Sequence, residues 1–191
     1  MARQGYRSEV NESIKPHPLW CGEHQGGMSE PVLTAEEVLR WNESTSGEWR
    51  KLLKGHPELL AVPCDIAKTS TVAQLLQHIV AVELRYAERL AGVPETEYES
   101  IPFDTVEKIY ATHDRASALF RQVLASDVDW DGVMEFKTRS YGSARASRKT
   151  ILFHALLHTQ RHYAQLATLV RQHGHQIERP ADYLFMGIML G

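Results

Sequence analysis

The sequence predicts an all-α fold, a four-helix bundle with a long crossover between helices three and four in which a short β-hairpin is one option. Four segments place apolar residues at spacings of three and four, the period of an amphipathic helix. Each segment also opens or closes with residues that cap helices. With 191 residues, 43% of them hydrophobic and 24% charged, the chain can support one globular core.

The first two helices carry clear boundary signals. One opens at Thr34 with Glu37 three residues later, which is a capping box, and ends near Gly55. The other starts at residues 70–71 and ends before Gly92. Their apolar stripes contain Val38, Trp41, Trp49 and Leu52 in the first, and Leu75, Ile79, Val82, Tyr86 and Leu90 in the second.

The third and fourth helices follow the same rules. The third is expected to begin with Asp104 as the N-cap and Glu107 at the capping-box position. The fourth covers residues 147–173, with Gly174 in the position after the helix where a left-handed conformation is favoured. The apolar stripe of the third helix contains Val106, Ile109, Ala116, Phe120 and Val123.

The link between these two helices, residues 127–146, has a different pattern. Residues 133–139 alternate weakly between apolar and polar, and Tyr141 and Gly142 suggest a turn. We expect a short hairpin or an extended crossover. A link of this length would allow helices three and four to run parallel.

The termini differ from the bundle in composition. Residues 1–28 are polar, contain Pro16 and Pro18, and lack the continuous apolar core of a signal peptide. We expect a polar N-terminal arm or a mis-assigned start there, and a single bundle domain over residues 29–191. Residues 183–190 are too apolar to lie in water, so we expect them to pack on the bundle or on a second subunit.

Charge and cysteine content exclude several classes of protein. The formal net charge of −3 suggests neither a nucleic-acid partner nor a membrane surface. The longest apolar run, residues 184–190, is too short to span a bilayer. The two cysteines, Cys21 and Cys64, do not form a disulfide framework or a zinc ribbon. A cytoplasmic protein with a small-molecule substrate is the remaining expectation.

The placement of the ten histidines is the strongest functional signal. His154, His158 and His162 recur every four residues on one stripe of the fourth helix, and neighbouring members can chelate one ion. The outer two lie roughly 12 Å apart along the helix axis, too far for one coordination sphere. One pair therefore binds, and the residues alone do not select which.

A further ligand should come from a facing helix. His78 lies on the core face of the second helix, between Leu75 and Val82, and His113 has the same kind of position in the third helix. A purely structural interpretation stays open as well, because buried histidines commonly serve as hydrogen-bonded core residues. In that case the stripe would be a polar seam inside the bundle.

The chain resembles the DinB-like (DinB/YfiT-like) superfamily of bacterial metal-binding four-helix bundles over roughly residues 34–178. The resemblance is carried by LLQHIVAVELRYAERL at residues 75–90 and RKTILFHALLHTQRHYAQ at residues 148–165. It implies one divalent ion, nickel, zinc, iron or manganese, bound by a histidine of helix two and a pair in helix four that is followed three residues later by glutamine. The implied ligands are His78, His158 and His162. His154 and Gln165 are then expected beside them or in the pocket.

The resemblance also implies candidate functions. The first is a metal-dependent transferase that uses a low-molecular-weight thiol; a metal-dependent hydrolase and a non-catalytic stress-response or binding module with a structural metal are the alternatives. Members are often dimers, so we expect a homodimer. The substrate and the catalytic residues stay open, and Glu83 should point away from the ligand stripe.

One basic stretch suggests an anionic substrate. Residues 136–150 contain five basic side chains and no acidic one, although a solvated loop would have the same composition. Arg145 and Arg148 are the expected contacts, since arginine binds carboxylates with two parallel hydrogen bonds. The other three basic residues are Lys137, Arg139 and Lys149.

Overall fold

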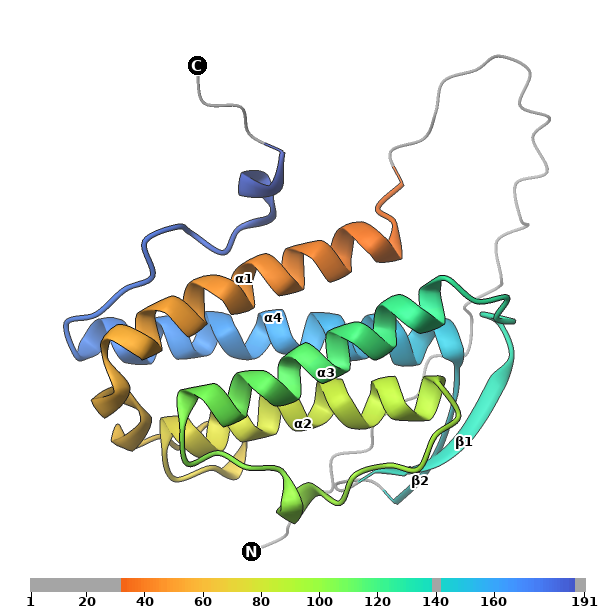
Figure 1. Ribbon diagram of the computed structural model, residues 1–191, viewed down its shortest axis with the longest axis horizontal. Coiled ribbons are helices and arrows are strands. Elements are labelled where there is room, and N and C mark those ends of the chain that lie inside the picture. Colours follow the sequence, from red (N-terminus) through yellow and green to blue (C-terminus); the bar gives the residue numbers. More distant parts are fainter. Residues whose placement is uncertain (1–31, 139–141, 188–191) are drawn as a thin grey trace, which may run out of the picture. The chain divides into compact units, whose positions relative to one another are not determined.

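The computed structural model describes residues 32–138 and 142–187, and it confirms the predicted fold class. Four helices form the bundle, and a two-stranded antiparallel hairpin precedes the last of them (Figure 1). The expected arm at residues 1–28 and the turn residue Tyr141 lie outside the described residues. The division into an arm and a bundle domain stays a prediction.

The elements have the following bounds. The helices are α1 (Ala35–Gly55), α2 (Val72–Leu90), α3 (Val106–Leu124) and α4 (Arg148–Gln172), and the strands are β1 (Val133–Thr138) and β2 (Gly142–Ser147). Four short 3-10 helices connect or follow them: η1 (Pro57–Ala61), η2 (Ile66–Lys68), η3 (Tyr98–Ser100) and η4 (Tyr183–Met186).

Side-chain caps determine where the helices begin. The predicted capping box of α1 is complete, because Thr34 accepts from the Glu37 amide and Glu37 accepts from the Thr34 amide. The predicted N-cap of α3 is wrong by one residue. Thr105, and not Asp104, accepts from the Lys108 amide at 3.3 Å. Asp104 instead accepts from the Lys108 ammonium group at 2.6 Å.

Contacts between side chains fix the directions of the helices. Glu83 of α2 contacts His113 of α3 and Thr159 of α4, and α1 packs on α3 and α4 (Figure 1). In Figure 1, α2 and α3 run parallel, and the link 91–105 returns the chain between them. α3 and α4 run antiparallel, so the parallel arrangement that the long link would allow is not adopted. The hairpin turns the chain round at one end of the bundle, and α4 returns from there.

The core is formed by apolar side chains from all four helices. Trp49 of α1 stacks on Tyr163 of α4 with ring centroids 5.6 Å apart, and both rings are fully buried. Leu53, Leu76 and Leu166 are also fully buried, and each such side chain contributes about 1.5–3 kcal/mol relative to an exposed one. This burial holds α1, α2 and α4 against one another.

The hairpin is attached to α2 by an arginine. Phe136 of β1 packs over the guanidinium group of Arg89 at 4.4 Å, and Tyr86 lies against the same group at 4.7 Å. The alternating burial of β1 turns Met134 and Phe136 inward. A cation–π contact of this kind is stabilising where the charge is partly desolvated.

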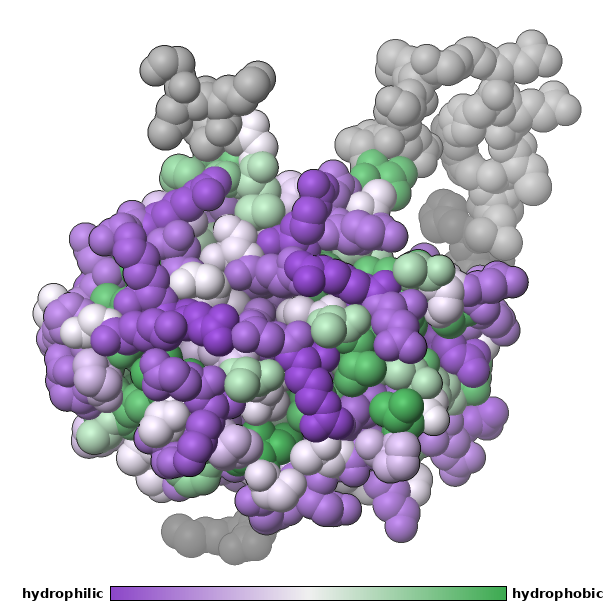
Figure 2. All heavy atoms as spheres, in the orientation of Figure 1, coloured by the Kyte–Doolittle hydropathy of each residue, from purple (hydrophilic) through white to green (hydrophobic). Residues whose placement is uncertain are grey.

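Polar residues cover most of the face drawn in Figure 2, over α1 and α3, with apolar residues between them. The exposed large apolar side chains of the described residues are Val32, Leu33, Val93, Phe103, Val133, Leu157, Tyr183 and Leu184. Among the described helices, none is both long and apolar enough to cross a membrane.

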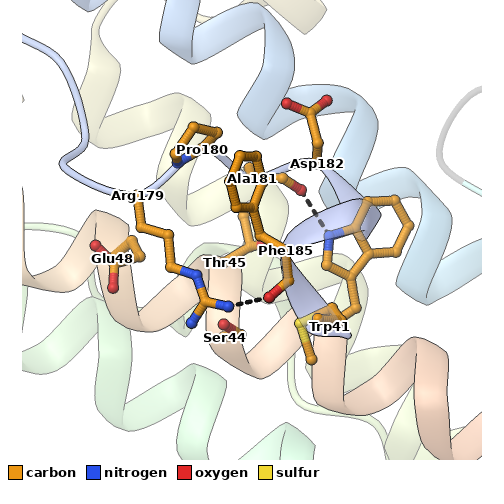
Figure 3. A pocket seen from close by; sticks show the side chains of 10 residues that line it. Trp41, Ser44, Thr45, Glu48, Arg179, Pro180, Ala181, Asp182 and Phe185 are labelled. Carbon is orange, nitrogen blue, oxygen red and sulfur yellow. Dashed lines mark hydrogen bonds between the residues drawn. The ribbon is translucent and has the colours of Figure 1, made fainter. Parts of the chain in front are cut away.

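The described part of the apolar C-terminal segment packs on α1. The Trp41 indole Nε1 donates to the Ala181 carbonyl at 2.6 Å (Figure 3). The Tyr183 ring meets the Trp41 ring edge-on, with the ring centroids 5.5 Å apart. This agrees with the expectation that the segment packs on the bundle. Its last residues, 188–190, lie outside the described part, and the expected contact with a second subunit stays a prediction.

Two glycines, one inside a helix and one just after a helix, provide a matched test of the backbone conformation at each position. Gly47 lies exposed inside α1, and Gly174 adopts φ +82° after α4; an added Cβ would meet nothing within 4 Å at either position. Gly47→Ala should raise the free energy of unfolding by about 0.5–1 kcal/mol, because alanine loses less entropy in a helix. Gly174→Ala should lower it by about 1–2 kcal/mol, because the left-handed conformation strains a Cβ. Urea unfolding measures both, and shifts of the same sign would contradict the assignment.

Candidate metal centre

Three imidazoles converge between α2 and α4. The Nε2 atom of His158 lies 3.1 Å from Nε2 of His78 and 3.1 Å from Nε2 of His162. Metal–nitrogen bonds of about 2.0–2.1 Å place neighbouring ligand nitrogens roughly 3.0–3.4 Å apart. The spacing suits one ion, and these three residues form a group that could hold a metal.

The antiparallel packing of α2 and α4 produces this convergence. His158 and His162 lie one turn apart on the stripe of α4 that faces α2, and His78 faces them from α2. His154, one turn earlier, packs against Tyr86 with ring centroids 5.4 Å apart. It stays at the edge of the group, in the position expected for a pocket residue.

Neighbouring groups set the protonation of His162. Gln165 Oε1 accepts from Nδ1 of His162 at 2.7 Å, which leaves Nε2 as the unprotonated nitrogen of the ring. The Arg161 guanidinium donates to the same Nε2 at 3.1 Å. Burial, followed by the charge of Arg161, lowers the pKa of His162. The ring is therefore neutral at neutral pH.

His158 contacts both of the other imidazoles and is poorly able to carry charge. Burial and then the neighbouring His162 and His78 lower the pKa of His158 to about 2. Its buried Nδ1 has no hydrogen-bond partner among the described residues. A single hydrogen on Nε2 of His158 could not satisfy both of its 3.1 Å contacts. A cation bound by the Nε2 lone pairs of all three rings would satisfy them. The donor set thus fits a divalent metal ion.

His113, the alternative ligand considered from the sequence, belongs to a different cluster. Its Nδ1 lies 2.7 Å from Oε2 of Glu83, and both side chains are buried. Oε1 of Glu83 accepts from Asn42 and from Thr159, each at 2.8 Å. One carboxylate thus joins side chains from α1, α3 and α4. Glu83 faces away from the three imidazoles, as expected.

A cavity of about 730 Å³ lies beside the imidazoles. Its walls come from α2, α4, η2, η3 and the hairpin, and all three predicted ligands and His154 line it. Gln165 lines it too. The volume is ordinary for a site that binds a small molecule.

The basic side chains of the cavity differ from those expected. Arg145 and Arg148 do not line it: Arg145 lies on β2 opposite Glu135, and Arg148 donates to the Asp129 carbonyl at 3.3 Å. The basic residues that line it are Lys68, Arg85, Arg89, Lys137 and Arg161. Of the expected basic stretch, Lys137 is the member that reaches the cavity, while Arg139 lies outside the described residues.

Three of these cations are available to a ligand. Arg85 and Arg89 form ion pairs with Glu95. In the described part of the chain, no carboxylate pairs with Lys68, Lys137 or Arg161. Lys68 also has φ +61°, and a strained conformation of this kind is common at binding sites. Lys68 and Arg161 were not among the residues predicted from the sequence, although Arg161 directly precedes an implied ligand.

Comparison with known proteins supports the resemblance seen in the sequence. A family model described as DinB family matches residues 28–187, which is most of the chain. No curated protein matches at a significant level.

The buried pair of Glu83 and His113 should make stability depend on pH. Burial alone would lower the pKa of His113, but the charge and hydrogen bond of Glu83 outweigh it, so the pKa is raised above 6.5. The stabilisation is complete below pH 6.5, the unfolded value, and is lost as the pH rises through the raised folded pKa. Asp114 and Glu43 add to the same shift, while Ser117 and Tyr110 contact the ring.

Urea unfolding of the metal-free protein and of His113→Gln from pH 5.5 to 8.5 tests this. The difference in unfolding free energy between the two should shrink as the pH rises. The histidines of the candidate metal centre that have lowered pKa values change the stability of both proteins equally. Their effect therefore cancels in the difference between the two proteins. A difference that is constant with pH would contradict the assignment.

Proposed function

Because the chain belongs to the DinB family, we propose that His78, His158 and His162 bind one divalent metal ion, and that the protein is a metal-dependent transferase using a low-molecular-weight thiol. The observation that carries the proposal is the convergence of three imidazole nitrogens on the wall of a cavity large enough for a small molecule. Three protein ligands leave at least one coordination position for a substrate, which is typical of catalytic sites.

When bound, the ion would supply Lewis-acid chemistry, which favours the thiolate form of a thiol or the hydroxide form of water. In the transfer, the thiol sulfur forms a bond to an electrophilic carbon of the second substrate. The leaving group departs with the electron pair of the broken bond, and the thiol proton passes to solvent. No side chain of the described residues is assigned as the general base.

The residues of the chain would orient an anionic substrate. Arg161 contacts the His162 ring and lines the cavity, so its guanidinium group can bind a carboxylate next to the imidazoles. Lys68 and Lys137 add positive charge on other walls. The apolar rings of Tyr86 and Phe136 complete the cavity near the hairpin.

A metal that serves mainly as a brace is less well supported. Glu83 already ties α2 to α4 through Thr159 and to α1 through Asn42, without any ion. The hydrophobic core also includes buried residues of both α2 and α4. We therefore expect the metal-free protein to stay folded, with a helical circular dichroism spectrum and a cooperative melt. Loss of helical structure on chelation would favour the structural alternative.

Metal analysis of protein purified without a histidine tag tests the ligands. His78→Ala, His158→Ala and His162→Ala should each lower the metal content from about one equivalent to about a tenth of it, because each removes a ligand. His154→Ala is the matched control, one turn away on the same helix, and should retain the wild-type content. Full retention in the first three variants would refute the site.

A thiol panel tests the reaction and the role of Arg161. Metal-loaded protein should couple mercaptoacetate to an aryl chloride faster than it couples 2-mercaptoethanol. Arg161→Gln should remove this preference by lowering kcat/KM for mercaptoacetate about 10- to 100-fold, as expected for a lost charge-assisted hydrogen bond, while the metal content is retained. Ester hydrolysis without thiol transfer would favour the hydrolase, and no turnover with either would favour a binding module.

A further inference from the structure

A second group of metal-binding side chains lies outside the cavity, where α1 and α4 end. It consists of His56, Glu58 and His175, whose ligand atoms all lie within 4.8 Å of one another. Nδ1 of His56 is 3.2 Å from Oε1 of Glu58, and the rings of His56 and His175 have centroids 4.3 Å apart. We propose that these three residues form a second divalent metal site, which fastens the C-terminal segment to the bundle.

The backbone holds two of the ligands at the end of α1. His56 is the C-cap of α1, and its amide donates to the Leu52 carbonyl at 3.0 Å. Pro57 then begins η1 and fixes the chain direction, which places Glu58 in the first turn of that helix. The carboxylate consequently lies beside the His56 ring.

The third ligand is positioned by the end of α4. Gly174 adopts φ +82°, its amide donates to the Arg171 carbonyl at 3.1 Å, and the His175 amide donates to the Val170 carbonyl at 3.1 Å. These two bonds are the Schellman arrangement, which determines where the residue after the glycine lies. His175 is therefore held by α4 while its ring lies against His56.

The electrostatics of this end favour a cation. Figure 1 shows that α1 and α4 run in the same direction, so the C-termini of both helices lie at this end of the bundle. The carbonyl ends of helices carry partial negative charge. The Glu58 carboxylate adds negative charge beside the two imidazole rings.

The donor set indicates the class of ion. Two imidazoles and one carboxylate suit zinc, cobalt or nickel better than calcium or magnesium, which prefer oxygen ligands. Ligand atoms around one such ion lie roughly 3.0–3.4 Å apart, so the side chains would have to close by about 1 Å. The groups are also more exposed than the three imidazoles of the cavity. We therefore expect weaker binding at this second site.

The consequence of binding would be felt along the C-terminal segment. After His175 the chain returns over α1, where Glu178 pairs with Lys51 and the Ala181 carbonyl accepts from Trp41 (Figure 3). Arg179 donates to the Phe185 carbonyl within the segment. These contacts are partly exposed and separately weak. An ion at the start of the segment would restrict the whole of it.

Zinc titration of the full chain tests the proposal. After the cavity site has been filled with one equivalent of zinc, calorimetry should detect a second, weaker equivalent. His56→Ala and His175→Ala should remove the second equivalent and leave the first unchanged. His173→Ala is the control, since His173 is exposed, lies two residues from His175 and is outside the group. Saturation at one equivalent, or an equal loss in His173→Ala, would overturn the proposal.

Hydrogen exchange provides an independent readout. Zinc beyond one equivalent should slow exchange at residues 176–187 in the wild type and in His78→Ala, but not in His175→Ala. Because His78 belongs to the other site, this comparison separates failure of the second site from failure of the first. Glu58→Gln keeps the shape of the side chain and should weaken the second binding event about 10-fold, as expected for loss of a charged ligand. Unchanged exchange in zinc-saturated wild type would overturn the fastening role.

Discussion

The buried carboxylate of Glu83 accepts hydrogen bonds from Asn42 and Thr159 and pairs with His113, so each of the other three helices contributes one partner. A carboxylate in this position loses its hydration, and the loss is tolerable only when both oxygens are satisfied. Because the three partners come from different helices, the bundle must assemble in one register for the group to be stable. Apolar packing alone would specify that register less strictly.

The same constraint positions the three imidazoles of the candidate metal centre. Thr159 directly follows His158 on α4, and Glu83 lies on α2 with His78. Fixing Thr159 against Glu83 fixes α4 against α2 both along and around their axes. The imidazoles then meet on the opposite side of the same helix pair, facing the cavity. The polar network thus acts as the rigid support that a preorganised site requires.

Local features of the sequence predicted most of the fold. Caps and apolar periods depend on residues within one or two turns, so the start of α1 at Thr34 and the end of α4 at Gly174 follow directly. The four-residue spacing of the α4 histidines is local in the same sense. The position of the α3 cap was missed by one residue, since Asp104 and Thr105 can both cap and a lysine decides between them.

Features that depend on distant contacts could not be predicted in the same way. The partner of His113 lies thirty positions earlier in the chain, and only the packing of α2 on α3 brings the two together. The direction of α4 depends on how the hairpin turns the chain, and the length of the link between α3 and α4 does not determine that turn. The cations of the cavity were misassigned for a similar reason. Lys137 and Arg145 both occupy exposed positions on the same face of the hairpin, so the strand pattern does not separate them, and only the packing of the hairpin beside the helices brings Lys137 to the cavity.

The hairpin has a consequence for how such a protein can diversify. It contributes Phe136, Lys137 and Ala146 to the cavity wall but none of the three imidazoles, and it is inserted at one end of the bundle between α3 and α4. Changes in its length or sequence would reshape the entrance without disturbing the register of the helices. The helices that hold the three imidazoles and the hairpin that forms part of the cavity wall are therefore separable parts of the chain. A lineage can change the hairpin while it inherits the register of the helices intact.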